Sequence, residues 1–171
     1  MSERMRILVV DDEESLREVL SEVLTDDGYP VTTAATAEEA LVAFEADPFS
    51  LVISDIRMPG MDGITLLERV KALHEETQVI IITSHASLDS AVTALRAGAY
   101  DYLIKPFEDI NLISAVVARA ADKVRLVIEN RVLVEKLKSY NNELESVNHV
   151  LRELAIRDGL TGLYNHRYFQ E

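Results

Sequence analysis

The sequence contains no cysteine and no apolar run long enough to cross a membrane. Without cysteine, disulfide bonds and thiol catalysis are excluded, and the composition fits the reducing cytoplasm. A membrane-spanning helix needs about 20 consecutive apolar residues, and no stretch approaches that length. The N-terminal residues run directly into an apolar stretch of strand length, so we expect no signal peptide. These absences predict a cytoplasmic protein.

Positive charge is scarce as well. The 171 residues include 17 Lys and Arg against 30 Asp and Glu, so the formal net charge is −13. A chain this acidic repels nucleic acid and anionic membranes, and we expect neither as a direct partner. Hydrophobic residues make up 48% of the chain, which is typical of a globular protein with a sizeable core.

Short apolar stretches alternate with segments of helical periodicity over the first two thirds of the chain. The predicted strands are 6–10, 30–35, 51–55, 78–83 and 100–104, and the predicted helices are 13–27, 37–46, 64–74 and 88–97. Such alternation predicts parallel strands with helices on both faces and right-handed crossovers. Pro30 cannot donate to a strand ladder, so its strand belongs at an edge. We predict an α/β fold, doubly wound and flavodoxin-like, whose five-stranded parallel sheet has the order 2-1-3-4-5.

Polar side chains stand where the predicted strands end, at the carboxyl edge of the sheet. Asp11 and Asp12 follow the first strand, Asp55 and Thr83 end the third and fourth, and Lys105 follows the fifth. Two carboxylates ~5 Å apart repel by about 3 kcal/mol at an effective dielectric constant of ~20, so the cluster needs a cation. All-oxygen ligands with open positions suit Mg²⁺. Asp55 is then the predicted nucleophile, and its product with a phosphoryl group is an acyl phosphate.

The neighbouring groups have matching roles in this interpretation. The metal and Lys105 neutralise the charge of the phosphoryl group, and the Thr83 hydroxyl donates a hydrogen bond to a phosphoryl oxygen. Each residue also has a plainer interpretation, because the aspartates could cap turns or helices, Thr83 could be a strand hydroxyl and Lys105 a surface lysine. Their occurrence together at matching strand ends favours the site.

Residues 4–125 closely resemble response-regulator receiver domains. The residues that carry the resemblance are Asp11-Asp12, Asp55 with Met58-Pro59 and Met61-Asp62-Gly63, Thr83, and Tyr102 before Lys105-Pro106-Phe107. The resemblance implies that Asp55 accepts a phosphoryl group from a sensor histidine kinase and that Lys105 contacts it. It also implies Mg²⁺ held by Asp12, Asp55 and the Arg57 carbonyl, with Asp11 acting partly through water, and a cis Lys105–Pro106 bond.

The resemblance further implies a switch. Thr83 and Tyr102 would form the pair that rearranges the face made by the fourth helix, the fifth strand and the fifth helix, which is also an expected dimer face. Positions two after the phosphoacceptor and two after Thr83 tune phosphate lifetime in this family, and here they are Arg57 and His85. His85 could position a water molecule or face solvent without a role.

After Asp109 the pattern changes to a heptad repeat. The predicted seam consists of Leu126, Asn130, Leu133, Leu137, Tyr140, Leu144, Val147, Leu151 and Leu154, with Asn130, Leu137, Leu144 and Leu151 at a positions. No Gly or Pro interrupts residues 107–158, so we expect the last helix of the domain to continue into the seam, over roughly 70 Å. The favoured assembly is a parallel coiled-coil homodimer in which Asn130 fixes register and strand number. A helix folded back on its own domain is the alternative.

The last residues carry a second resemblance. Asp158-Gly159-Leu160-Thr161-Gly162-Leu163-Tyr164-Asn165 is similar to the opening of a GGDEF (diguanylate cyclase) domain, whose catalytic signature is absent here. We therefore predict a receiver domain at 1–122, a coiled-coil linker at 123–156 and the truncated start of a GGDEF domain at 157–171. The fragment itself is expected to have no enzyme activity beyond weak self-dephosphorylation.

These observations predict a two-component response regulator in which Asp55 controls the dimer geometry of a cyclase output missing from this chain. One alternative is the receiver arm of a transcription regulator with an ATPase or DNA-binding output, although residues 158–165 and the lack of a basic helix argue against it. Another is a phosphohydrolase with an aspartate nucleophile, but Arg57 stands where such enzymes commonly need a second aspartate.

Overall fold

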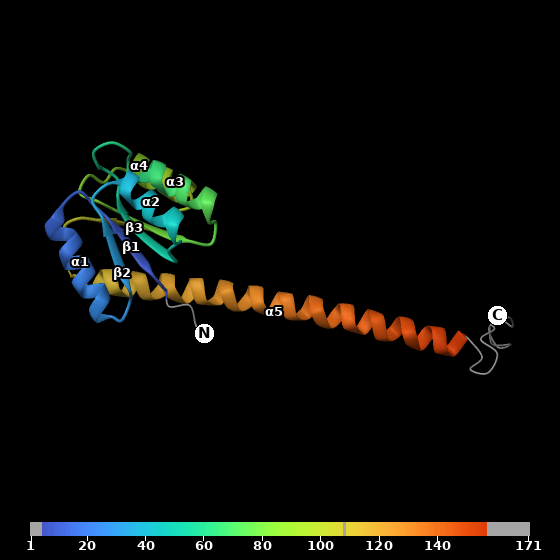
Figure 1. The fold of residues 1–171 in the computed structure, drawn as a ribbon. Helices are drawn as coiled ribbons and strands as arrows, with labels where there is room; N and C mark the ends of the chain where they lie inside the picture. Colours follow the sequence, from blue (N-terminus) through green and yellow to red (C-terminus); the bar gives the residue numbers. More distant parts are fainter. Residues whose placement is uncertain (1–4, 108, 157–171) are drawn as a thin grey trace. The chain divides into compact units, whose positions relative to one another are not determined.

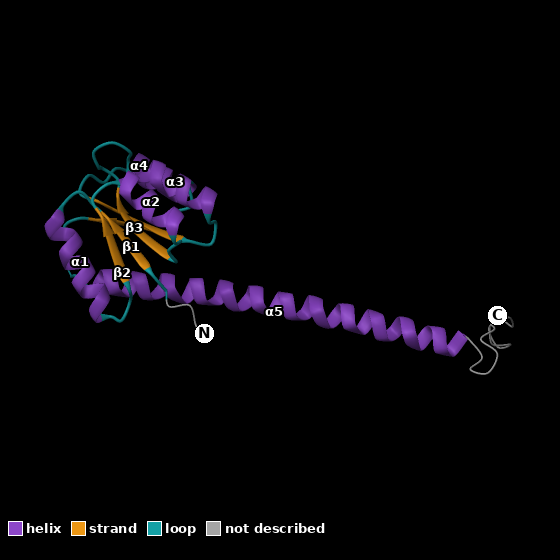
Figure 2. Cartoon of the chain, viewed as in Figure 1, coloured by secondary structure: helices purple, strands orange, loops and turns teal. Residues whose placement is uncertain are grey.

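The computed structural model describes residues 5–107 and 109–156. Its elements are β1 (Ile7–Val10), α1 (Glu14–Asp26), β2 (Val31–Ala34), α2 (Ala37–Ala46), β3 (Leu51–Asp55), α3 (Gly63–Leu73), β4 (Gln78–Thr83), α4 (Leu88–Arg96), β5 (Asp101–Ile104) and α5 (Asn111–Ile156). The five strands form one parallel sheet in the order β2-β1-β3-β4-β5 (Figures 1 and 2). The predicted fold class is confirmed, with strand β2 at an edge.

Helices cover both faces of the sheet, as the alternating strand residues require. Ile7 and Val9 of β1 pack in a cluster with side chains of α1 and α5, whereas Leu8 and Val10 pack in a second cluster with α2, α3 and α4. Figure 1 shows the same division, with α1 and the start of α5 on one face and α2, α3 and α4 on the other. Because β1, β3 and β4 are buried on both faces, they read as continuous apolar runs.

The start of α3 lies unusually close to the end of β3. A Cβ atom at Gly63 would lie 1.9 Å from the carbonyl oxygen of Asp55, so no residue with a side chain fits there. Asp62 is the N-cap, and its side chain accepts a hydrogen bond from the backbone N–H of Thr65 at 2.7 Å. The Asp62-Gly63 pair therefore fixes α3 directly behind the residue that ends the central strand.

Helix α5 is a single helix of 46 residues, as the absence of Gly and Pro predicts. Ile113, Val116, Val117 and Ala120 are buried against the sheet. The chain divides into two compact units between Val127 and Ile128. In the second unit the seam residues Leu133, Leu137, Tyr140, Leu144, Val147, Leu151 and Leu154 are exposed in the single chain.

Two further expectations bear on the chain as a whole. Among the described residues, none of the helices combines the length and the apolar character that a membrane span requires. The GGDEF-like segment at 157–171 lies outside the described residues.

Candidate functional site

Asp55 stands at the carboxyl end of the central strand, almost completely buried. It is the last residue of β3, and its residue exposure is 4%. One carboxylate oxygen, Oδ1, accepts a hydrogen bond from the backbone N–H of Arg57 at 3.1 Å. The fold thus holds a carboxylate at the sheet edge and orients it through the turn that follows.

Lys105 joins two of the predicted site aspartates. Its ammonium nitrogen lies 2.7 Å from Oδ2 of Asp55 and 2.9 Å from Oδ2 of Asp11. The Lys105 side chain is 11% exposed and that of Asp11 is fully buried. The peptide bond between Lys105 and Pro106 is cis, as the family resemblance implies. Strands β1, β3 and β5 therefore bring residues 11, 55 and 105 into direct contact.

Asp11 and Lys105 have shifted pKa values. Burial raises the pKa of the Asp11 carboxyl above its ordinary value, although hydrogen bonds from Lys105 and from the Glu13 backbone oppose that shift. Burial acts to lower the pKa of Lys105, but hydrogen bonds to Asp55 and Asp11 outweigh it, so this pKa is raised. Lys105 therefore keeps its positive charge at the edge of the sheet.

The three aspartates form one oxygen-rich cluster. A carboxylate oxygen from each of Asp11, Asp12 and Asp55 lies within 4.8 Å of the others. Asp12 is exposed, whereas Asp11 and Asp55 are buried, so the cluster opens to solvent on one side. Carboxylate oxygens with open positions for water are the ligands that hard divalent cations prefer. The donor set therefore fits a Mg²⁺ ion.

Thr83 ends β4, the strand next to β3, and is buried. Its hydroxyl oxygen accepts a hydrogen bond from the backbone N–H of His85 at 3.2 Å. The His85 side chain is exposed, with its Nδ1 atom 3.1 Å from the Ser84 hydroxyl. The hydroxyl of Thr83 is thus held by the first turn after the strand.

Tyr102 lies on the edge strand β5 and contacts helix α4. The Tyr102 hydroxyl is 2.9 Å from the hydroxyl of Ser90, and the aromatic side chain is partly buried against the α2–α4 core. Strand pairing places Ile81 opposite Tyr102 and Thr83 opposite Ile104. The predicted switch residues Thr83 and Tyr102 therefore lie on adjacent strands.

Sequence reasoning missed two supporting residues. Arg17 donates a hydrogen bond to the carbonyl oxygen of Asp11 at 2.6 Å, which ties α1 to the β1 end of the site. Ser90 belongs to a capping box with Ser87 at the start of α4. The spacing of the two serines signals a helix start, but no local pattern signals the contact with Tyr102.

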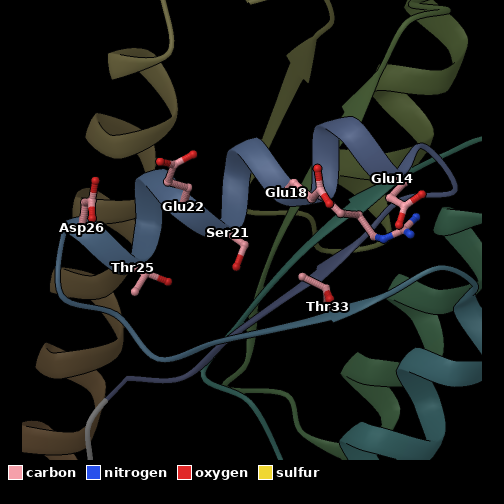
Figure 3. A pocket seen from close by; sticks show the side chains of 8 residues that line it. Glu14, Glu18, Ser21, Glu22, Thr25, Asp26 and Thr33 are labelled. Atoms are coloured by element: carbon pink, nitrogen blue, oxygen red, sulfur yellow. The ribbon is translucent and has the colours of Figure 1, made fainter.

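A surface hollow of about 510 Å³ lies beside α1 and β2 (Figure 3). It is lined by Glu14, Arg17, Glu18, Ser21, Glu22, Thr25, Asp26 and Thr33. None of the aspartates of the cluster lines it, nor does Lys105. The candidate site is therefore the carboxyl edge of the sheet and not the hollow.

Comparison with known proteins identifies the family of residues 7–117 and several relatives. The family model described as "Response regulator receiver domain" matches residues 7–117. The C4-dicarboxylate transport transcriptional regulatory protein DctD of Rhizobium meliloti is 41% identical over 133 residues, which are 78% of this chain and 29% of that protein. The DNA-binding transcriptional regulator NtrC of Salmonella typhimurium is 46% identical over 114 residues, which are 67% of this chain and 24% of that protein.

Solved structures superpose on a similar share of the chain. The crystal structure of NtrX from Brucella abortus in complex with ADP superposes with a TM-score of 0.68 at 38% identity, covering 72% of this chain and 28% of that one. The solution structure of the beryllofluoride-activated NtrC4 receiver domain dimer superposes with a TM-score of 0.63 at 36% identity, covering 71% of this chain and 97% of that one. This chain spans less than a third of the length of the curated relatives described above.

Proposed function

This chain belongs to the response regulator receiver domain family, and on that premise we propose that Asp55 is its phosphoacceptor. The contact of Lys105 with Asp55 and Asp11 supports this assignment most directly. It places a fixed positive charge beside one buried carboxylate at the end of a strand. That is the arrangement that phosphoryl transfer needs, because charge on the transferred group has to be offset by positioned cations.

The chemistry is a transfer from a histidine of a sensor kinase, the partner that a receiver domain implies. A carboxylate oxygen of Asp55 bonds to phosphorus while the bond between phosphorus and the imidazole nitrogen breaks. The electron pair of the broken bond returns to the imidazole, and Asp55 becomes an acyl phosphate. The Lys105 ammonium gives up part of its contact with Asp55 and donates a hydrogen bond to one phosphoryl oxygen. The Thr83 hydroxyl donates a hydrogen bond to another phosphoryl oxygen.

Asp11, Asp12, Asp55 and the Arg57 carbonyl would hold Mg²⁺, with Asp11 acting partly through water. When bound, this ion would neutralise the transferred phosphoryl group and the carboxylates around it. The cluster of three carboxylates supports the assignment. Apart from slow loss of its own phosphoryl group, residues 1–171 have no enzymatic role in this proposal.

Phosphorylation is proposed to act on an assembly of two chains. It adds about −1.5 to −2 charge at the sheet edge, and Thr83 and Tyr102 respond by moving toward it. The face formed by α4, β5 and α5 exposes Leu88, Leu95 and Ile104, which suits contact with a second copy. The exposed heptad seam of α5 suits a parallel two-stranded coiled coil, which would carry the change to the output domain.

Two outputs are candidates. The relatives favour the receiver arm of a transcription regulator, since DctD and NtrC are named as such and the NtrX structure holds ADP. For this chain, that would place DNA binding outside residues 1–171. The segment Asp158–Asn165 favours the predicted diguanylate cyclase output instead. The coding sequence after residue 171, followed by assay of the complete protein with GTP or with ATP, decides between them.

Acetyl phosphate with Mg²⁺ tests the phosphoacceptor. Mass spectrometry should show one added phosphoryl group that hydroxylamine removes, because acyl phosphates react with hydroxylamine and phosphate esters do not. Asp55→Ala should gain none, and the matched variant Asp62→Ala, which changes a nearby capping aspartate, should still be labelled. The proposal would be overturned if hydroxylamine left the phosphoryl group in place, or if Asp55→Ala gained as much phosphoryl group as the wild type.

A further inference from the structure

Helix α4 is held to the domain by few apolar contacts. Of its nine residues only Ala94 is buried, and Leu88, Val92 and Leu95 are exposed. Helix α3, by contrast, buries Leu66, Leu67 and Val70 among other residues. A helix with little buried apolar surface depends on its polar contacts to keep its position.

Those polar contacts converge on one hydroxyl, that of Ser90. It accepts a hydrogen bond from the Ser87 backbone N–H at 3.1 Å and donates one to the Ser87 carbonyl oxygen at 3.0 Å. A serine hydroxyl has one proton and two acceptor lone pairs, so one lone pair remains. Both the Tyr102 hydroxyl and the Ser87 hydroxyl lie 2.9 Å from it. Ser90 therefore belongs to the cap of α4 and to the side chain of Tyr102 at once.

We propose that Ser90 is a positioning residue that latches Tyr102 to the N-terminal cap of α4. Movement of Tyr102 and rearrangement of the α4 cap are then coupled, because the Ser90 hydroxyl takes part in the hydrogen bonds of both. This proposal rests on the proposed function in one respect, the role of Tyr102 as a switch residue. It adds the Ser90 hydroxyl oxygen as the atom that connects Tyr102 to α4.

The latch has a defined consequence for the unphosphorylated protein. While Tyr102 donates its proton to Ser90, the tyrosine is held beside α4. Removing either hydroxyl takes away one hydrogen bond that favours this position. The share of molecules with Tyr102 released should then rise by roughly threefold to tenfold, the range expected for one net hydrogen bond.

Three single variants and one double variant test the latch. Ser90→Ala and Tyr102→Phe each remove one hydroxyl of the pair, and the double variant removes both. Ser87→Ala is the matched control, since it weakens the same cap but leaves the Ser90–Tyr102 pair intact. The readout is the nuclear magnetic resonance shift of the residue 102 ring and of the Ala91 and Thr93 amides, with and without beryllofluoride and Mg²⁺.

Without beryllofluoride, Ser90→Ala and Tyr102→Phe should each move the two amide signals toward their positions in the beryllofluoride-treated protein. The double variant should move them no further than the larger single change, because both substitutions remove the same bond. Ser87→Ala should leave the Tyr102 ring signal in place. Additive effects of Ser90→Ala and Tyr102→Phe, or an equal ring shift in Ser87→Ala, would overturn the latch.

Failure of the proposed function gives a different result. If wild-type protein shows no response to beryllofluoride and no label from acetyl phosphate, the phosphoacceptor assignment fails. The double-variant comparison of the Ala91 and Thr93 amides in untreated protein still decides whether Ser90 and Tyr102 are coupled.

Discussion

Helix α5 carries two apolar stretches that differ in what covers them. Between Ile113 and Ala120 the apolar side chains are buried against the sheet, at the spacing of one helix face. From Leu133 to Leu154 a similar alternation of three and four residues leaves every seam side chain exposed in the single chain. Periodicity thus reveals which face of a helix is apolar, but it does not reveal whether the same molecule or another one covers that face.

The largest expected effect is loss of dimerisation when leucines of the exposed stretch are replaced by lysine. Leu137→Lys combined with Leu144→Lys removes four leucines from a two-chain seam, each worth about 1.5–3 kcal/mol when buried, and adds four like charges. The dissociation constant of the dimer should rise by at least about a thousandfold. Sedimentation equilibrium should then show monomers at concentrations where the parent chain is dimeric.

The matched control adds the same charges on another face of the same helix. Ser139 and Ser146 occupy c positions of the heptad, so Ser139→Lys with Ser146→Lys should leave the dimer intact. A parent chain that is monomeric at all concentrations, or a Leu137→Lys and Leu144→Lys variant of unchanged mass, would contradict the seam.

A smaller effect, of another kind, is expected in the covered stretch. Ile113→Ala leaves a cavity against the sheet and should lower the free energy of unfolding of the receiver by about 2–5 kcal/mol, independent of protein concentration. Urea unfolding followed by circular dichroism measures it. Leu133→Ala removes an apolar side chain of the same size from the seam and should leave that receiver transition unchanged. Equal losses in the two variants would mean that the two stretches do not differ.

The sequence was sufficient for the sheet because its central strands have strong local signals. The predicted bounds 51–55 and 78–83 coincide with β3 and β4, whose residues are buried on both faces and apolar throughout most of their length. The weaker strands differ by a residue or two, since β2 is an edge strand with two exposed threonines. Strand order then followed from right-handed crossovers and from Pro30.

The site was predictable as far as backbone position determines it. Parallel strands place residues 11, 55, 83 and 105 at one sheet edge whatever their rotamers, and the structure brings Asp11, Asp55 and Lys105 into contact. Ser90 was not predictable, because its contact with Tyr102 depends on where α4 lies over the sheet. The cyclase output was inferred from residues outside the described part of the chain, and the relatives favour the transcription-regulator alternative.

The smallest expected effect is the pH dependence of the receiver's free energy of unfolding, to which Lys105 contributes and the seam does not. Because hydrogen bonds to Asp55 and Asp11 raise the pKa of Lys105 above its ordinary 10.5 despite burial, the charged amine is favoured in the folded state. Its contribution to stability is fully present below pH 10.5 and is lost as the pH rises through the raised value. Urea unfolding of the wild type and of Lys105→Met at increasing alkaline pH isolates this group from the tyrosines and other lysines. The difference in free energy of unfolding between the two proteins should change above pH 10.5 in the direction that disfavours the wild type. A constant difference across that range would show that the ion pair does not couple proton binding to folding.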